Sequence, residues 1–318
     1  MRALSAFVLD LNAQAQDHGM AGLVDWAVTE LSDLIGFDSA WYGWAQIQTT
    51  SPVIHSSSLL NLPNDFFAAW TEISHQDVLV NQFVEDPLCV PTYDRQGTLQ
   101  TDGMGTLADR YGIRKMATAM CLREARSASL YVSAYRSGQR AKNWSQEEKE
   151  FLQCAVDNIS AAARIAAMND LHSQNAQAAT FFLSAQGATI IGLSNVRERF
   201  GHLWASSDGD QAPRWLAGFL DQPGEHVLVD RDLVASCEQA KTSDGQSLYK
   251  VSLRPLRKFD LLTARERDVA AILASGKTHK ETARLLGVAP STIRNQTQSI
   301  YEKLCIDNRA SLTKHVLS

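Results

Sequence analysis

The sequence lacks the features that mark membrane proteins, disulfide-rich secreted domains and zinc fingers. No apolar run approaches the roughly 18–20 residues that a membrane-spanning helix needs, and no signal-peptide cleavage pattern follows the short apolar run at the N-terminus. The five cysteines are scattered and include no Cys-x-x-Cys pair, which favours buried reduced thiols over disulfides or a metal site. We therefore expect a cytoplasmic protein with no membrane partner, no metal and no cofactor.

Motifs of the common enzyme classes are also missing. The eight histidines form no His-x-x-x-His or His-Glu-x-x-His pair, and there is no Gly-x-Ser-x-Gly, no P-loop and no other glycine-rich nucleotide loop. The chain starts with a helical pattern, not with the apolar strand and paired acidic residues of a phosphorylation receiver domain. His55 and His75 could lie near Asp77, but a solvated or hydrogen-bonded histidine is the better interpretation. The sequence thus predicts a protein that is not an enzyme and has no catalytic residues.

Charge is distributed unevenly along the chain. The formal net charge is −5, which by itself argues against a nucleic-acid partner. However, residues 257–318 carry 11 basic and 6 acidic side chains, whereas the remainder carries 19 basic and 29 acidic ones. This asymmetry predicts a basic module attached to an acidic body.

At 318 residues the chain is long enough for two or three domains, and its patterns predict a multi-domain α+β protein. The first domain, residues 1–170, mixes helix and strand. GLVDWAVTELSDLIGF has helical spacing and ends at Gly36, and SAWYGWAQI is strand-like. Asn61 is a possible cap of a helix that has Pro63 near its first turn. MATAMCLRE and SASLYVSAYR are expected to form a strand pair.

A capping box of Ser145 and Glu148 opens a long helix that continues without a clear stop toward Ala179. Nothing that follows it in this domain looks able to cover its whole apolar stripe. The helix is therefore a candidate dimer element or interdomain connector, and its first half is equally a candidate core helix of its own domain.

Residues 171–257 are predicted to form a small second domain. A hairpin pattern, TFFL-SAQG-ATIIGL with Gly187 in the turn, precedes Asn195 and the helix-like VRERFGHLW. EHVLVD and SLYKVSLRPL are strand candidates, and the latter alternates as a half-buried strand does. The strand, turn, strand and Asn195 resemble the opening of a PAS domain. No cofactor motif is present, since Cys237 lacks the surroundings of a flavin-linking cysteine.

Residues 258–318 have the start and stop signals of four short helices. Thr-x-x-Glu capping boxes at Thr263 and Thr278 open the first two helices, glycines end them, and Pro290 opens the third. Only GVAP joins the second helix to the third, which is the arrangement of a helix-turn-helix unit.

The third of these helices keeps its apolar residues to a thin stripe. Arg294, Asn295 and Gln298 lie together on another side near its N-terminus, with no carboxylate among them. A B-form major groove admits one helix, whose N-terminal residues meet the base edges. Arg can give two hydrogen bonds to guanine, and Asn or Gln two to adenine. A solvated face is the alternative, but the basic module and the tight helix pair favour base contacts.

Four further side chains are candidate phosphate contacts. Ser291 and Thr292 lie in the first turn of the third helix, where hydroxyls and free backbone N–H groups can hold a phosphate. Lys280 on the second helix and Lys303 at the end of the third could flank the DNA backbone. Together these residues predict double-stranded DNA as the partner.

The stretch from Leu262 to Leu312, LTARERDVAAILASGKTHKETARLLGVAPSTIRNQTQSIYEKLCIDNRASL, resembles the DNA-binding domain of the LuxR family of transcription regulators. Leu-Thr-x-Arg-Glu, Gly-Lys, Ala-x-x-Leu-Gly, Thr-Ile-Arg-Asn, Lys-Leu and Asn-Arg-Ala stand at the spacing of that family. The resemblance places the Arg, Asn and Gln above at base-reading positions, and it implies an internal ion pair between Glu266 and Arg309.

The chain departs from the family pattern at three positions of this domain. Ala289 stands where the family often has a serine cap, Thr282 replaces an aliphatic residue, and Cys305 replaces a glycine. None of these changes removes an expected DNA contact.

Residues 36–168 resemble, more loosely, the GAF-like acyl-homoserine-lactone sensor of quorum-sensing members of the family. The order of elements matches: an aromatic strand, a helix with aromatic residues, an aspartate, and two strands before a long helix. In that sensor an aspartate accepts the ligand's amide N–H while aromatic residues line the acyl chain. The resemblance implies that Tyr42, Trp70, Asp77 and Tyr93 bind the ligand.

Departures from the sensor pattern favour a small-molecule or metabolite effector of open identity over a lactone. The family's Asp-Pro is Asp-Val here, and Phe66 and Trp70 stand for its Trp and Tyr. The rival interpretation is control by a protein partner, or no ligand at all, which predicts an N-terminal domain without a cavity. Because one helix-turn-helix unit buries too little DNA surface for tight binding, we expect a homodimer. The linker near residues 254–260 is the expected hinge of the switch.

Overall fold

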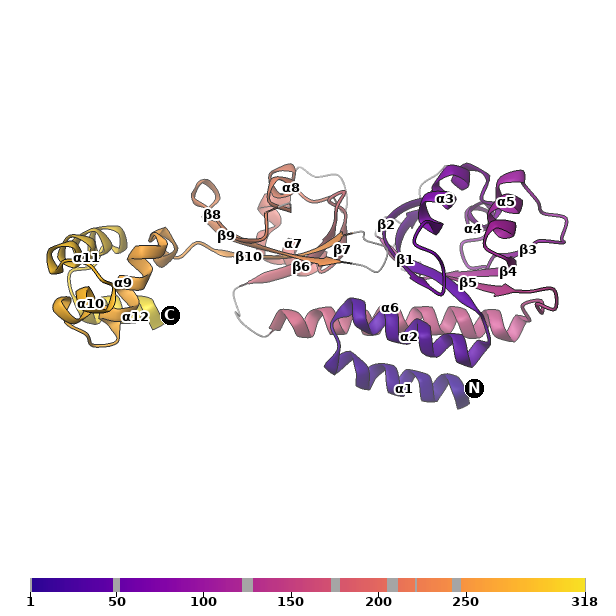
Figure 1. The fold of residues 1–318 in the computed structure, drawn as a ribbon, viewed down its shortest axis with the longest axis horizontal. Helices are drawn as coiled ribbons and strands as arrows, with labels where there is room; N and C mark the ends of the chain where they lie inside the picture. Colours follow the sequence, from indigo (N-terminus) through magenta and orange to yellow (C-terminus); the bar gives the residue numbers. More distant parts are fainter. Residues whose placement is uncertain are drawn as a thin grey trace. The chain divides into compact units, whose positions relative to one another are not determined.

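The structure is a computed structural model, which describes residues 2–47, 52–121, 128–172, 178–204, 211–220, 222–241 and 247–317. The chain divides into two compact units, Met1–Gly224 with Cys237–Ser252, and Glu225–Ser236 with Leu253–Ser318. Two five-stranded sheets and a C-terminal group of helices make up the described part (Figure 1). The predicted α+β fold class is confirmed.

The first sheet is antiparallel and has the strand order β2-β1-β5-β4-β3. Its strands are β1 (Ser39–Ile47), β2 (Pro52–Leu60), β3 (Thr92–Asp94), β4 (Ile113–Met120) and β5 (Ser129–Ser137). β1 and β2 approach closely at Gly43, where a Cβ atom would lie 2.1 Å from the backbone oxygen of Ser56. Only glycine fits at that point, and the register shifts one residue later, between Trp44 and Ala45.

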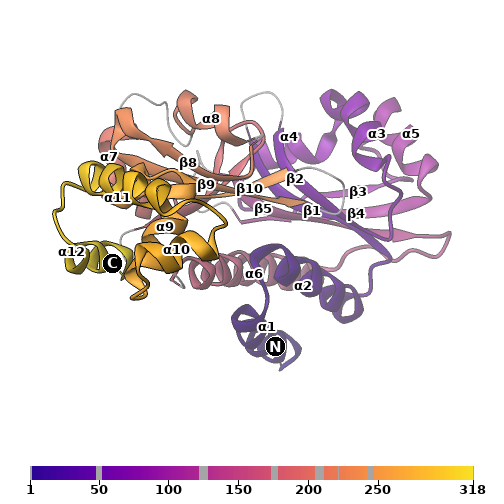
Figure 2. The same cartoon turned by 60° about the vertical axis from the view of Figure 1, so that its left-hand side comes forward.

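Helices cover both faces of this sheet (Figures 1 and 2). On one face lie α2 (Met20–Ile35) and α6 (Gln146–His172), and α1 (Arg2–Asp17) packs on their outer side. The other face carries α3 (Phe66–Ile73), α4 (Val78–Glu85) and α5 (Asp102–Arg110), with the short helix η1 (Ser74–Gln76) between α3 and α4. A separate apolar core lies on each side. The first seven residues of β1 are consequently all buried, so this strand has no polar face.

The predicted capping box at the start of α6 is confirmed. The Ser145 amide donates to Glu148 Oε2 at 2.8 Å, and the Glu148 amide donates to Ser145 Oγ at 3.2 Å. The apolar stripe of α6, from Leu152 to Ala167, packs against α1 and α2 and is buried. These covering helices precede α6 in the chain, whereas the prediction concerned only the segments that follow it. Residues 173–177, into which the helix was expected to continue, lie outside the described residues.

Two further local predictions had different outcomes. α2 ends at Gly36 as expected, with that residue in the left-handed conformation (φ 76°). Asn61 does not cap α3, because the residue before this helix is Asp65. Asn61 instead has a positive φ of 53° and donates from Nδ2 to the Asp38 carbonyl oxygen at 3.0 Å.

The second sheet has the order β7-β6-β10-β9-β8, which is the order of the first sheet when the strands of each are numbered separately. It consists of β6 (Ala179–Ser184), β7 (Thr189–Ile191), β8 (Gly224–Leu228), β9 (Leu233–Lys241) and β10 (Ser247–Pro255), accompanied by α7 (Leu193–Trp204), α8 (Arg214–Leu220) and η2 (Val229–Arg231). The predicted β6–β7 hairpin is confirmed, with Gly187 at φ 80° in its turn. β9 and α8 had no counterpart in the sequence analysis.

The C-terminal helices are η3 (Lys258–Leu261), α9 (Ala264–Ala274), α10 (His279–Leu285), α11 (Pro290–Leu304) and α12 (Arg309–Leu317). They enclose a small apolar core that includes Val269, Leu273, Ile293, Ile300 and Leu312. The four predicted helices of this region are all present.

Candidate functional site: the exposed face of α11 and the N-terminal cavity

Reciprocal side-chain caps mark the N-termini of α9 and α10. At α9 the Glu266 amide donates to Thr263 Oγ1 at 3.2 Å and the Thr263 amide donates to Glu266 Oε2 at 2.8 Å. The same two bonds join Thr278 and Glu281 at the start of α10, at 3.3 and 2.7 Å. Each box satisfies two backbone donors that the helix start would otherwise leave open. The turn from α10 to α11 follows at once and brings α11 across α9 and α10.

α11 begins with Pro290 at its first turn, and the side chain of Ala289 before it makes no cap. Helix formation here relies on the fixed φ of proline and on the buried Ile293, Thr297, Ile300 and Leu304. Thr297 Oγ1 donates to the Ile293 carbonyl oxygen at 2.7 Å, so its hydroxyl adds no unsatisfied group to the core. The exposed face of the helix is thereby fixed.

The predicted base-reading residues lie on that exposed face. Arg294, Asn295 and Gln298 are all solvent-exposed. Gln298 Nε2 donates to Glu302 Oε1 at 3.2 Å, one turn further on. The predicted phosphate contacts Ser291, Thr292 and Lys280 are exposed as well. The structure therefore brings three donor-rich side chains together near the N-terminus of α11 and leaves them accessible.

Lys303 occupies a different environment. Its Nζ lies 2.7 Å from Glu266 Oε2 and 2.9 Å from Oε1, and Ser299 Oγ donates to the same carboxylate at 2.9 Å. Burial alone would raise the pKa of Glu266, but the hydrogen bonds from Lys303, Thr263 and Ser299 outweigh it and lower the pKa to about 2. Lys303 thus ties α11 to α9.

The expected ion pair between Glu266 and Arg309 is wrong. Arg309 Nη2 donates to the backbone carbonyl oxygens of Leu273 and Lys277, the latter at 2.9 Å. Arg309 therefore fastens the end of α9 to the start of α12, and Lys303 takes the position next to the Glu266 carboxylate.

A cavity lies between the first sheet and helices α3, α4 and α5. It encloses about 590 Å³ of space, part of which is open to solvent. Most of its wall is apolar, including Ile47, Ile54, Leu79, Phe83, Met104 and Met116. The described lining residues include no Lys, Arg or His, and Asp77 is the one carboxylate among them.

Asp77 is buried at the N-terminus of α4. Its Oδ1 accepts the Leu79 amide at 2.9 Å, as an N-cap side chain does, and its Oδ2 accepts Trp70 Nε1 at 2.9 Å. Burial raises the pKa of the Asp77 carboxyl, while the bonds from Trp70, Leu79 and Val80 act in the opposite direction without cancelling the effect. The structure brings the predicted ligand residues Trp70 and Asp77 together in the cavity wall.

The other two predicted ligand residues lie elsewhere. Tyr42 faces the opposite side of the sheet, where its OH donates to Asp25 Oδ1 at 2.8 Å. The neighbouring Trp41 takes the place in the cavity wall instead. Tyr93 is buried beside α5 but is not among the lining residues, and its OH donates to Gln100 Oε1 at 2.7 Å.

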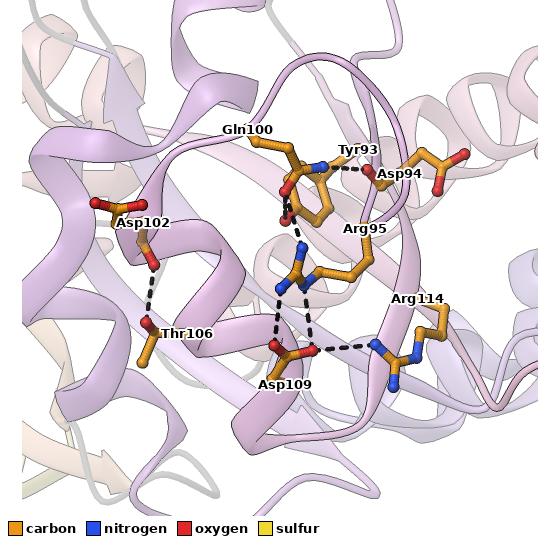
Figure 3. Close-up of polar contacts among 8 residues, drawn as sticks. All are labelled: Tyr93, Asp94, Arg95, Gln100, Asp102, Thr106, Asp109 and Arg114. Atoms are coloured by element: carbon orange, nitrogen blue, oxygen red, sulfur yellow. Dashed lines mark hydrogen bonds and ion pairs between the residues drawn. The ribbon is translucent and has the colours of Figure 1, made fainter.

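Figure 3 shows the network to which Tyr93 belongs. Arg95 approaches Gln100 and makes two bonds to Asp109 on α5, from Nε at 3.1 Å and from Nη2 at 2.8 Å, while Arg114 reaches the same carboxylate at 3.0 Å. The network fastens the loop before α5 to that helix. Since Met104 and Leu107 of α5 line the cavity, it supports the cavity wall from outside.

Three aromatic residues that the strands contribute to the cavity wall were not predicted as ligand residues. Trp41, Tyr131 and Tyr135 line the cavity on β1 and β5, close to a buried hydroxyl pair in which Thr118 Oγ1 and Ser133 Oγ are 2.8 Å apart. Alternation within a strand would normally identify inward residues, but both faces of this sheet are buried and the pattern gives no such signal.

Two other classes of site were searched for in the described residues. No group of three or more His, Cys, Asp or Glu side chains that could hold a metal ion occurs there. Within the same described ranges, every helix is too short or too polar to cross a membrane.

Comparison with known proteins identifies the C-terminal region. The family model described as "Bacterial regulatory proteins, luxR family" matches residues 260–316. These residues are a luxR-family DNA-binding domain. The match covers η3 and α9 to α12, which carry the capping boxes and the exposed face of α11.

Curated relatives match over short stretches. SgaR of Hyphomicrobium methylovorum, a probable transcriptional regulatory protein, is 41% identical over 52 residues, which are 16% of this chain and 25% of SgaR. NarL of Mycobacterium tuberculosis, also a probable transcriptional regulatory protein, is 31% identical over 100 residues, 30% of this chain and 46% of NarL. This chain thus spans less than half of the length of these relatives.

Solved structures give only low overall similarity. A crystal structure of Escherichia coli SdiA is 12% identical with a TM-score of 0.36, covering 98% of this chain and 96% of that chain. CepR2 from Burkholderia cenocepacia, described as an N-acylhomoserine lactone dependent LuxR family transcription factor, is 15% identical with a TM-score of 0.38, covering 54% of this chain and 99% of that chain. Similarity at these scores does not establish what this chain binds.

Proposed function

We propose that this protein is a sequence-specific transcription regulator that binds double-stranded DNA through α11 and is controlled by a small molecule held in the N-terminal cavity. The observation that carries the first part is the exposed face of α11. Arg294, Asn295 and Gln298 are accessible there, within a domain of the luxR family. Arg, Asn and Gln are the side chains that give bidentate hydrogen bonds to guanine and adenine in the major groove.

The surroundings of this face support phosphate contacts beside it. Ser291 and Thr292 lie in the first turn of α11, where backbone N–H groups are also available to an anion. Lys280 adds an exposed positive charge from α10. Lys303 is a weaker candidate than the sequence suggested, because a phosphate would have to compete with the Glu266 carboxylate at 2.7 Å.

The cavity supports the second part of the proposal. A regulator switched by a protein partner alone would need no space inside its N-terminal domain, and here about 590 Å³ not filled by protein atoms, part of it open to solvent, lies between the first sheet and three helices. A mostly apolar wall with a few convergent polar groups is the usual form of a small-molecule site. Trp70 and Asp77 belong to it, and Trp41 replaces Tyr42 among the ligand-facing residues that we propose.

We further propose that the protein acts as a homodimer. One helix-turn-helix unit contacts a single half-site, and two such units one helical turn of DNA apart bury the surface that tight binding needs. A near-palindromic operator is the corresponding expectation for the DNA.

The test starts from an operator selected from random duplexes with the full-length protein. Gel shifts on that operator are then compared for the wild type, Arg294→Ala and Gln298→Ala. Each substitution should weaken specific binding by about 1–3 kcal/mol and relax the preference at one base pair. Lys314→Ala, which removes an exposed positive charge from α12, is the control for a general loss of charge. Unchanged sequence preference in both α11 variants would reject the assignment.

A further inference from the structure

The cavity contains an uncompensated carboxylate. Asp77 is 9% exposed, and the described lining residues offer it no Lys, Arg or His as a counter-ion. Its partners are neutral donors, namely the indole N–H of Trp70 and the backbone of α4. Buried carboxylates are normally paired with a cation. A buried carboxylate that has only neutral hydrogen-bond donors therefore marks a place where a positive charge would be stabilised.

Aromatic rings surround the same place. Trp70 is hydrogen-bonded to Asp77 through its ring nitrogen, and its ring centroid lies 4.7 Å from that of Trp41. Tyr131 lies edge-on to Trp41 with centroids 5.2 Å apart. The charge of Asp77 contributes to the raised pKa of Tyr135. All four rings line the cavity. The face of an aromatic ring attracts a desolvated cation through its negative potential.

We propose that the cavity binds an organic cation, a substituted ammonium or similar group with an apolar body, whose charged head lies between Asp77 and the rings of Trp41, Trp70, Tyr131 and Tyr135. The proposal rests on the proposed function, because it takes the cavity as the effector site and names the chemical class of the effector. The apolar remainder of such a ligand would extend along the Leu, Ile, Met and Phe side chains of the wall.

The cavity wall favours this class over a neutral amide or a lipid-like acid. An anionic head would be repelled by Asp77, and the described lining residues offer no cationic side chain to bind it. A neutral amide could use a remaining lone pair of Asp77 and the ring N–H of Trp41, whose buried Nε1 has no hydrogen-bond partner among the described residues, but it brings no charge for the carboxylate to stabilise. A cation gains from the carboxylate and from each ring at the same time.

Proton binding provides a readout that needs no variant. Burial raises the pKa of Asp77, and a cation binds best to the ionised carboxylate. Affinity for a cation should therefore fall as the pH is lowered through that raised pKa, whereas affinity for a neutral ligand should not. Tyr131 and Tyr135 are the other titratable groups in the wall; burial raises the pKa of Tyr135, so this tyrosine stays neutral at acidic pH.

The experiment uses the full chain and two probes of the same shape. Benzyltrimethylammonium carries a quaternary nitrogen, and neopentylbenzene has carbon at that position. Dissociation constants are measured by isothermal titration and by tryptophan fluorescence at about pH 8 and about pH 5. N-hexanoyl-homoserine lactone is included as a neutral amide. We expect the cation to bind at least about tenfold more tightly than its carbon analogue at the higher pH, with the ratio shrinking at the lower pH.

Two variants and one matched control locate the effect. Asp77→Asn keeps an oxygen for the Leu79 amide but removes the charge, and should bring the ratio of the two affinities close to one. Trp41→Leu removes one ring and should lower cation affinity more than affinity for the carbon analogue. Asp25→Asn is the control, because Asp25 is a partly buried carboxylate on the opposite face of the same sheet, bonded to Tyr42.

The outcomes separate this proposal from the proposed function. Preference for the cation that vanishes in Asp77→Asn and persists in Asp25→Asn supports it. Equal binding of the two isosteres, binding of the lactone alone, or no binding of the cation overturns the organic-cation assignment. None of these results touches the gel-shift test of α11. A preference that survives in Asp77→Asn would equally reject the role of that carboxylate.

Discussion

The DNA-binding region and the N-terminal region each hold a buried carboxylate at the start of a helix, and the two have opposite environments. Glu266 of α9 is contacted by Lys303, Ser299 and Thr263, and its pKa is lowered to about 2. Asp77, at the start of α4, accepts hydrogen bonds from neutral donors only and faces a cavity. Burial raises its pKa. The first carboxylate is fully paired within the protein, and the second is not.

This difference separates a structural carboxylate from one available to a ligand. A carboxylate neutralised by a lysine of its own domain contributes to folding and has little to gain from a further partner. A carboxylate buried beside open space without a cation costs free energy in the empty protein and regains it when a suitable partner binds. Both residues act as helix caps, so capping alone does not distinguish the two roles.

The largest predicted effect is the loss of stability in Glu266→Gln. Removing the charge leaves Lys303 without its counter-ion and weakens the tie between α9 and α11, at a cost of about 2 kcal/mol. Hydrogen exchange of the α9 and α11 amides in the full chain measures it. Tryptophan fluorescence cannot, because all seven tryptophans precede residue 258.

The matched control is Glu281→Gln at the same position of the second capping box. Glu281 is exposed and accepts hydrogen bonds from Thr278, so a much smaller loss is expected. Asp77→Asn keeps one oxygen for the Leu79 amide but loses the acceptor of Trp70 Nε1, so it should cost about 1 kcal/mol, less than Glu266→Gln because no ion pair is broken. Equal losses in Glu266→Gln and Asp77→Asn would remove the contrast between the two sites.

The second prediction concerns pH and has opposite signs at the two sites. Because the pKa of Glu266 is lowered, its contribution to stability is complete above about pH 4.5, the ordinary pKa of a glutamate. That contribution is lost as the pH falls toward about 2. Lys303 is partly exposed, so solvent screening limits this loss to about 1–2 kcal/mol. Because the pKa of Asp77 is raised, its contribution to stability is complete below about pH 3.8, the ordinary pKa of an aspartate. That contribution is lost as the pH rises through the raised pKa.

Carboxyl resonances of the ¹³C-labelled full chain give both titrations directly. Glu266→Gln and Asp77→Asn assign the two signals by their disappearance. Glu266 should titrate about two pH units below its ordinary value, and Asp77 above its own. If Asp77 titrated in the ordinary range or below it, the carboxylate would already be satisfied in the empty protein, and the contrast with Glu266 would be lost.

Local patterns were predictable from the sequence, and pairings between distant residues were not. The capping boxes at Thr263, Thr278 and Ser145 each join residues three apart, so the spacing alone identifies them. Lys303, the partner of Glu266, lies 37 residues away, and the family resemblance implied Arg309 instead. Only the crossing of α11 over α9 decides between these two cations.

The cavity illustrates the same limit. Trp41 and Tyr42 are adjacent on a strand that is buried on both faces, so composition could not say which of them faces α3 and α4. The cover of α6 by α1 and α2 was also missed, because it joins the two ends of the domain. The exposed face of α11 was recoverable because a helix with one buried stripe assigns its other residues to solvent.

The smallest predicted effect lies at the one helix end of the DNA-binding region where the sequence departs from its expected glycine. Cys305 ends α11 with φ 55° and ψ 50°, a left-handed conformation that costs a residue with a Cβ atom about 1–2 kcal/mol. Cys305→Gly removes that strain but increases the freedom of the unfolded chain, so the net gain should be about 0.5–1 kcal/mol. Hydrogen exchange of the α11 amides measures this gain.

Asp232→Gly is the matched control, since Asp232 has the same φ of 55° but belongs to a residue type that tolerates this conformation, and it should gain less. A loss of stability in Cys305→Gly would mean that the exposed cysteine contributes contacts which outweigh its backbone strain.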